Sequence, residues 1–90
     1  MKKLTKNSSV GDFYDKAHYL MLQKEGRFTI QQVYEEILEG CDENVSFNFI
    51  KPIVLEVLDN LLNKGLIKYI DEGVGVFYQS SLTENIEQSV

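Results

Sequence analysis

His18 and Cys41 are the side chains best suited to nucleophilic or metal chemistry, and the chain has one histidine and one cysteine. Cys41 has no base close to it in sequence, and no third group is evident that would orient a Cys–His pair. A single cysteine excludes an intrachain disulfide and a thiolate zinc site, and a single histidine removes most histidine-based metal sites. We therefore expect Cys41 to be a small, partly buried apolar residue and His18 to be a surface or boundary residue.

Three other patterns have residue types that occur in binding sites, but their arrangement does not match such sites. Gly73 and Gly75 do not connect a strand to a helix, so they predict a tight turn and no phosphate-binding loop. The acidic stretch 35–43 lacks the alternating oxygen ligands of a calcium loop. The five tyrosines have no interleaved cations, which favours packing over base stacking. The sequence thus predicts no enzyme, no cofactor, no metal and no small-molecule substrate.

Length and composition predict one soluble domain. The 90 residues carry a net charge of -5, with 26% charged and 43% hydrophobic residues, as in ordinary globular proteins. No apolar run approaches the roughly 18–20 residues that a membrane span requires. No apolar stretch follows Met1–Leu4, so a signal peptide is not indicated. We expect a cytoplasmic protein without a membrane partner.

Two helices are indicated in the first half of the chain. Ser9 is followed three residues later by Asp12, and Thr29 by Gln32, which are capping boxes that predict helices to about residues 25 and 39. A glycine, suited to a helix stop, follows each pattern. Residues at helical spacing predict the buried faces: Phe13, Ala17, Leu20 and Met21, then Ile30, Val33, Tyr34, Ile37 and Leu38.

A third helix is predicted over 51–64. Pro52 lacks a backbone N–H and fits best in a first turn, so residues 46–50 are interpreted as a short packed turn. Gly65 ends the helix. The expected buried stripe consists of Val54, Val57, Leu58, Leu61 and Leu62.

After Gly65 the pattern changes to that of a β-hairpin. Branched and aromatic residues fill 66–70 and 76–79, and the intervening residues have turn chemistry. We expect a basic arm over 1–8, one domain over 9–79, and a polar tail over 80–90 that is a short helix or disordered.

Three helices followed by a hairpin resemble a winged helix-turn-helix domain. The segment from Leu58 to Ile67 resembles the junction where a recognition helix ends in glycine and enters the wing. Phe28 stands where such domains place a short strand that pairs with the wing. The second and third helices are also similar to the DNA-binding half of ferric-uptake-type regulators, although the typical recognition-helix threonine, tyrosine and arginine are absent here. The resemblance implies an α+β winged-helix fold, DNA binding and transcriptional control.

Under that resemblance, the third helix would enter the major groove and the wing would touch phosphates. The residues available for DNA are Lys2, Lys3, Lys6, Asn48, Lys51, Lys68 and Tyr69. The charge pattern opposes this hypothesis, because non-specific DNA affinity comes from Lys and Arg, whereas Glu56, Asp59 and an acidic wing tip lie on the same elements.

The alternative is a winged helix that serves as a protein-interaction or dimerisation module and does not bind DNA. Exposed Ile53 and Leu55 beside Pro52 would form a small apolar patch rimmed by acids, which marks a contact surface. Burial of Ile53 and Leu55 beneath Phe47 and Phe49 remains open. A homodimer through this helix, or through Leu82, Ile86 and Val90, would be the simplest form of this module.

Overall fold

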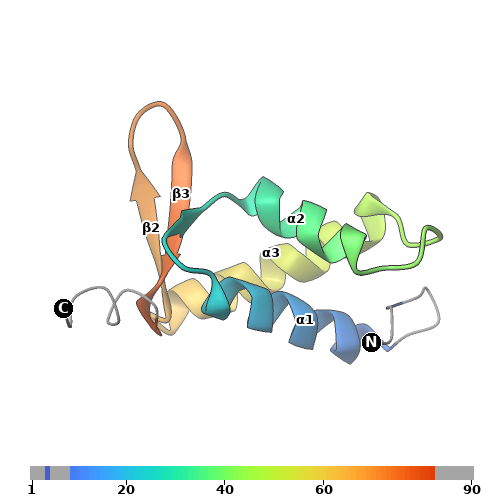
Figure 1. Cartoon of the computed structure of the whole chain (residues 1–90). Helices are drawn as coiled ribbons and strands as arrows, with labels where there is room; N and C mark the ends of the chain where they lie inside the picture. The colour runs from blue at the N-terminus through green and yellow to red at the C-terminus, as the bar shows by residue number, and fades with distance from the viewer. Residues whose placement is uncertain (1–3, 5–8, 83–90) are drawn as a thin grey trace.

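The computed structural model describes residue 4 and residues 9–82, and the structural statements below concern that part of the chain. Its elements follow the order α1 (Val10–Gln23), β1 (Arg27–Phe28), α2 (Ile30–Glu39), α3 (Phe47–Asn63), β2 (Ile67–Asp71) and β3 (Val76–Ser80) (Figure 1). The expected α+β class is confirmed. The arrangement is compatible with a winged-helix layout.

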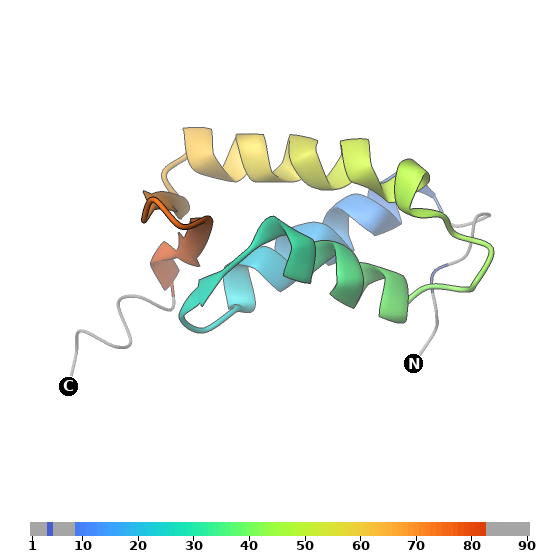
Figure 2. The same ribbon diagram turned by 90° about the horizontal axis from the view of Figure 1, so that it is seen from above.

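The three strands form one antiparallel sheet in the order β1-β3-β2. Phe28 in β1 lies opposite Tyr78 in β3, so the expected pairing of Phe28 with the hairpin is confirmed. Between β2 and β3 the chain turns through Gly73, whose φ of 82° lies in the left-handed region that glycine adopts without strain. Both views show the β2–β3 hairpin, hereafter the wing, at the end of the molecule where α3 finishes (Figures 1 and 2).

The core lies among the three helices and the base of the sheet, because each helix turns its apolar stripe inward. Helix α1 contributes Phe13, Ala17 and Met21, which are at most 1% exposed. Partly buried Phe49 meets the ring of Phe13 edge-on, with centroids 5.1 Å apart. From the other elements, the core contains Phe28, Val33, Ile37, Ile50, Val54, Val57, Leu61 and Ile67.

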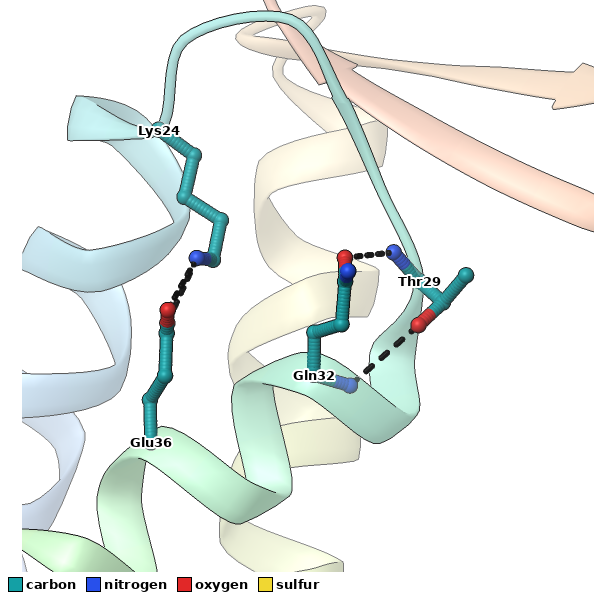
Figure 3. A network of polar contacts seen from close by, with 4 residues as sticks. All are labelled: Lys24, Thr29, Gln32 and Glu36. Atoms are coloured by element: carbon teal, nitrogen blue, oxygen red, sulfur yellow. Dashed lines mark hydrogen bonds and ion pairs between the residues drawn. The ribbon is translucent and has the colours of Figure 1, made fainter.

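Side chains cap the N-termini of α1 and α2, as the sequence predicts. Ser9 and Asp12 form one capping box, and Thr29 and Gln32 form the other. In the second box the backbone N–H of Gln32 donates to Thr29 Oγ1 at 3.2 Å, and the N–H of Thr29 donates to Gln32 Oε1 at 3.0 Å (Figure 3). These bonds satisfy N–H groups that no helical carbonyl can reach.

The expected boundary of the third helix is wrong by a full turn. Helix α3 begins at Phe47, not at residue 51, and Ser46 caps it by accepting a hydrogen bond from the N–H of Phe49 at 3.2 Å. Pro52 therefore lies inside the helix. Its missing N–H leaves only the carbonyl of Asn48 without an i−4 donor, and Asn48 is exposed. One lost bond near a solvated end is a small cost compared with burying Ile50 in the added turn.

The expected exposure of Ile53 is also wrong, because only 8% of this residue is accessible. Once the helix begins at Phe47, Ile50, Ile53 and Val57 follow one another at spacings of three and four, which places them on one face. Leu55 lies outside that row and is 43% exposed, so the expected apolar pair is divided between core and surface.

The ends of the described chain are attached to the body of the molecule. The N–H of Leu4 donates to the carbonyl of Gly40 at 3.3 Å, and the N–H of Asp42 donates to the carbonyl of Leu4 at 2.6 Å. Ser80, one residue past the expected domain end, is buried in β3 and donates through Oγ to the carbonyl of Leu22 at 2.7 Å. The remaining residues of the expected arm and tail, 1–3, 5–8 and 83–90, lie outside the described residues.

None of the described helices has the length and apolar character needed to cross a membrane. The cytoplasmic location stays a prediction.

Candidate functional site

The exposed side of α3 is the strongest candidate for a binding surface. We define the outer face of α3 as six exposed residues: Asn48, Lys51, Pro52, Leu55, Glu56 and Asp59. They lie on the side of α3 that faces away from its buried residues, which include Ile50, Val54 and Leu61. The structure thus brings together four residues proposed for DNA or protein contact: Asn48, Lys51, Pro52 and Leu55.

Within this outer face, one row along the helix carries an apolar residue between opposite charges. Lys51, Leu55 and Asp59 are spaced by four residues, so consecutive members of the row lie about one turn apart, roughly 6 Å. A single exposed leucine is ordinary on a protein surface. Here it is flanked by exposed Pro52 and by charges of both signs.

Phe47 belongs beside this face, and sequence reasoning missed it by assigning it to a turn. It is 38% exposed, and the Lys51 Nζ lies 5.9 Å from its ring centroid, within the range of a cation–π contact. The Tyr34 ring meets Phe47 edge-on at 4.9 Å, which anchors Phe47 to α2. The spacing of four between Phe47 and Lys51 would have predicted the pair if the helix had been started at Ser46.

Glu56 is drawn towards α1 by a hydrogen bond that Tyr14 donates to its Oε2. The bond raises the pKa of Tyr14, because ionising the phenol would remove the donor beside a carboxylate. It also occupies one oxygen of Glu56. Asp59 is consequently the carboxylate of the outer face that is more available to an external cation.

The wing carries the other residues proposed for DNA contact, Lys68 and Tyr69. Both are exposed on β2, and Tyr69 meets the ring of Tyr78 edge-on at 5.8 Å. The wing tip presents Asp71 and Glu72, which is unfavourable for gripping phosphates. Glu72 is paired with Arg27 of β1.

Val74, at the wing tip, is 96% exposed. Leu82, at the end of the described chain, is 48% exposed. The candidates Lys2, Lys3, Lys6 and Ile86 lie outside the described residues.

Acidic residues outnumber basic residues in the described part of the chain. Residues 9–82 include six Lys or Arg against twelve Asp or Glu. Among these cations, Arg27 contacts Glu72, and the Lys24 Nζ lies 2.6 Å from a carboxylate oxygen of Glu36 (Figure 3). A surface with this balance repels nucleic-acid phosphates except where its cations gather.

The described residues also include a shallow pocket and a buried thiol, and Cys41 is not among the residues that line this pocket. A shallow pocket of about 220 Å³ between α1 and α3 is lined by Tyr14, Asp15, His18, Val57, Asn60 and Lys64, none of which is a serine, threonine or cysteine. Cys41 is 6% exposed, and burial raises the pKa of its thiol. Within the described ranges, no three His, Cys, Asp or Glu side chains are grouped to hold a metal ion.

Comparisons with protein-family models, with curated proteins and with solved structures found no match to this chain. The residues of this chain, above all the exposed row Lys51, Leu55 and Asp59, are therefore the basis for a function.

Proposed function

We propose that this chain is a small winged-helix protein that does no chemistry and binds another protein chain through the outer face of α3. The observation that carries the proposal is the composition of that face. It offers exposed Leu55 and Pro52 at its centre, with Lys51 on one side and Asp59 on the other. Mixed charge around an apolar centre matches the anatomy of protein–protein contacts.

The acidic balance of the chain supports the same function. A protein partner can complement both signs of charge, whereas the charges that a duplex presents are those of its phosphates and are all negative. Lys51 is the only cation on the outer face of α3, and carboxylates follow it one and two turns later.

Peptide display tests this proposal without a known partner. Peptides that bind the immobilised original chain are first selected from a random library. Their affinities for the original chain and for the Leu55→Asp variant are then compared. We expect the selected peptides to bind the original chain at least tenfold more tightly, because the variant places a charge at the apolar centre. Asp15→Asn, an exposed change on α1, serves as the matched control. Peptides that bind Leu55→Asp as tightly as the original chain would refute docking on this face.

DNA binding is the second candidate function, and the order of elements favours it. In the winged-helix layout that the sequence resembles, α3 and the wing are the DNA-contacting elements, and Asn48 and Lys51 occupy the first turns of α3. Lys68 and Tyr69 would contribute from the wing, and Lys2, Lys3 and Lys6 from the N-terminal segment. Each phosphate contact would add to the salt dependence of the affinity.

A gel-shift titration with a mixed-sequence duplex at low salt tests this second candidate. If DNA is the ligand, a complex forms, and Lys51→Glu weakens it more than Lys64→Glu, which changes a lysine outside the outer face of α3. The absence of any complex at low salt would eliminate DNA binding.

A further inference from the structure

We infer that the partner of the outer face of α3 is a second copy of this chain, bound as an antiparallel two-fold dimer centred on Leu55. The inference rests on the proposed protein-docking function and names the partner. Its basis is the order of side chains along one row of α3, a cation, an apolar residue and an anion at positions 51, 55 and 59.

This row is complementary to itself when the second helix runs in the opposite direction. In a two-fold contact, residue i of one copy meets residue j of the other, and j meets i. With Leu55 on the axis, the residue four positions before it meets the residue four positions after it in the partner copy. Each Lys51 then faces an Asp59, so the dimer forms two equivalent ion pairs around one leucine contact. A parallel arrangement would instead oppose like charges.

The geometry of packed helices permits this contact. Two helices pack with axes about 8–10 Å apart, and rows of residues spaced by four interdigitate in the commonest packing class. Positions 51 and 59 lie only about 6 Å along the axis from the crossing point, so long side chains still reach across.

Glu56, the other carboxylate on the outer face of α3, adds little charge repulsion to the dimer. Tyr14 of the same chain donates a hydrogen bond to Glu56 and draws it towards α1. Asp59 is bonded within its own helix only by a long 3.4 Å contact from Asn63 Nδ2, so it can turn towards a lysine across the interface. Charge repulsion between two copies of net charge -5 acts at longer range and is screened within about 8 Å at physiological ionic strength.

The contact is small, because one helix face buries less than the roughly 1,200–2,000 Å² typical of stable complexes. We therefore expect a weak dimer that forms reversibly at high protein concentration. The exposed ion pairs set its specificity more than its strength.

Charge-swap variants followed by sedimentation equilibrium test the inference. Lys51→Asp places two carboxylate pairs across the axis, and Asp59→Lys places two ammonium pairs there. We expect each single variant to self-associate about tenfold more weakly than the original chain, or not at all. Mixing the two single variants should restore a dimer, because every pair across the mixed interface is then opposite in sign.

The double variant Lys51→Asp/Asp59→Lys is the matched control, because it keeps the composition and the net charge of the original chain. We expect it to dimerise like the original chain, since both pairs are reversed together. Circular dichroism of each variant checks that the helices remain, and Lys51→Met with Asp59→Asn provides neutral substitutes if a reversal unfolds the chain. Neutral variants should also weaken the dimer.

Two results would overturn the inference. One is an original chain that remains monomeric at millimolar concentration, and the other is a dimer that both single variants retain. Either result leaves the docking proposal standing if display-selected peptides still distinguish Leu55→Asp from the original chain. If those peptides do not distinguish them, the docking proposal fails as well.

Discussion

Two neighbouring residues on α3 differ in burial, and this difference decides what each substitution does. Ile53 is 8% exposed and belongs to the core, whereas Leu55 is 43% exposed on the outer face of α3. A reading of the sequence alone treated them as one apolar pair. Their separation is the most direct residue-level check on where α3 begins and which side it buries.

We predict opposite outcomes for aspartate at these two positions. Ile53→Asp buries a carboxylate among apolar side chains, so it should cost several kcal/mol and unfold this small domain. Leu55→Asp should change the free energy of unfolding by about 0.5 kcal/mol or less, because the new carboxylate stays in water. Urea denaturation followed by circular dichroism measures both. Equal destabilisation by the two substitutions would contradict the orientation of α3.

Buried Tyr34 and partly buried Tyr78 make the stability of the protein depend on pH in alkaline solution. Burial raises the pKa of Tyr34 and of Tyr78, and the proximity of the two phenols raises the pKa of Tyr34 further. In the unfolded chain these phenols ionise near pH 10, and in the folded chain they ionise only at higher pH. The contribution of these two tyrosines to the free energy of unfolding is therefore complete below pH 10, and it is lost as the pH rises through their pKa values in the folded chain.

Tyr34→Phe tests this dependence. Phenylalanine keeps the ring that meets Phe47 and removes the ionisable group. We expect the alkaline loss of stability to be smaller in the variant than in the original chain when urea midpoints are compared between pH 8 and pH 11. An unchanged pH profile would show that Tyr34 is accessible to solvent.

At the scale of elements, the starts of α1 and α2 were the most predictable features. Ser9 and Thr29 were identified as caps because the hydroxyl and the acceptor three residues later form a local hydrogen-bonding unit that needs no tertiary information. The wing was equally accessible, since the branched residues on either side of Gly73 have strand chemistry. Each of these features is encoded within a few consecutive residues.

The start of α3 was not predictable in the same way, because tertiary packing overrides a local signal. Pro52 indicates a first turn when only neighbouring residues are considered. In the folded chain, Ile50 enters the core and Phe47 packs on Tyr34, so the helix extends five residues upstream of the proline. The outer face of α3 depends on that start, which explains why Ile53 was placed at the surface and Phe47 was overlooked.

A cap substitution tests how much the second helix depends on its first turn. Thr29→Ala removes the side-chain acceptor for the N–H of Gln32 and should destabilise the protein by about 1 kcal/mol. Thr29→Ser keeps the hydroxyl and serves as the control. Thermal unfolding followed by circular dichroism compares the two. Equal melting temperatures for the alanine and serine variants would show that the cap contributes nothing to stability.

At the scale of the whole molecule, shape and charge point to different partners. The order of helices and strands is compatible with a winged-helix layout, which favours DNA. The described residues carry twice as many carboxylates as cations, and α3 presents an apolar centre between opposite charges, which favours a protein. We give more weight to charge because phosphate binding depends on cations directly, whereas a fold hosts many functions.

The central claim is that α3 meets a protein chain and does not meet DNA. Backbone amide NMR spectra, recorded first at rising protein concentration and then with added duplex DNA, test it directly. We predict concentration-dependent shifts at Lys51, Leu55 and Asp59 and no saturable change with the duplex. A spectrum that does not depend on protein concentration, together with saturable duplex-induced shifts along α3 and the wing, would contradict the claim.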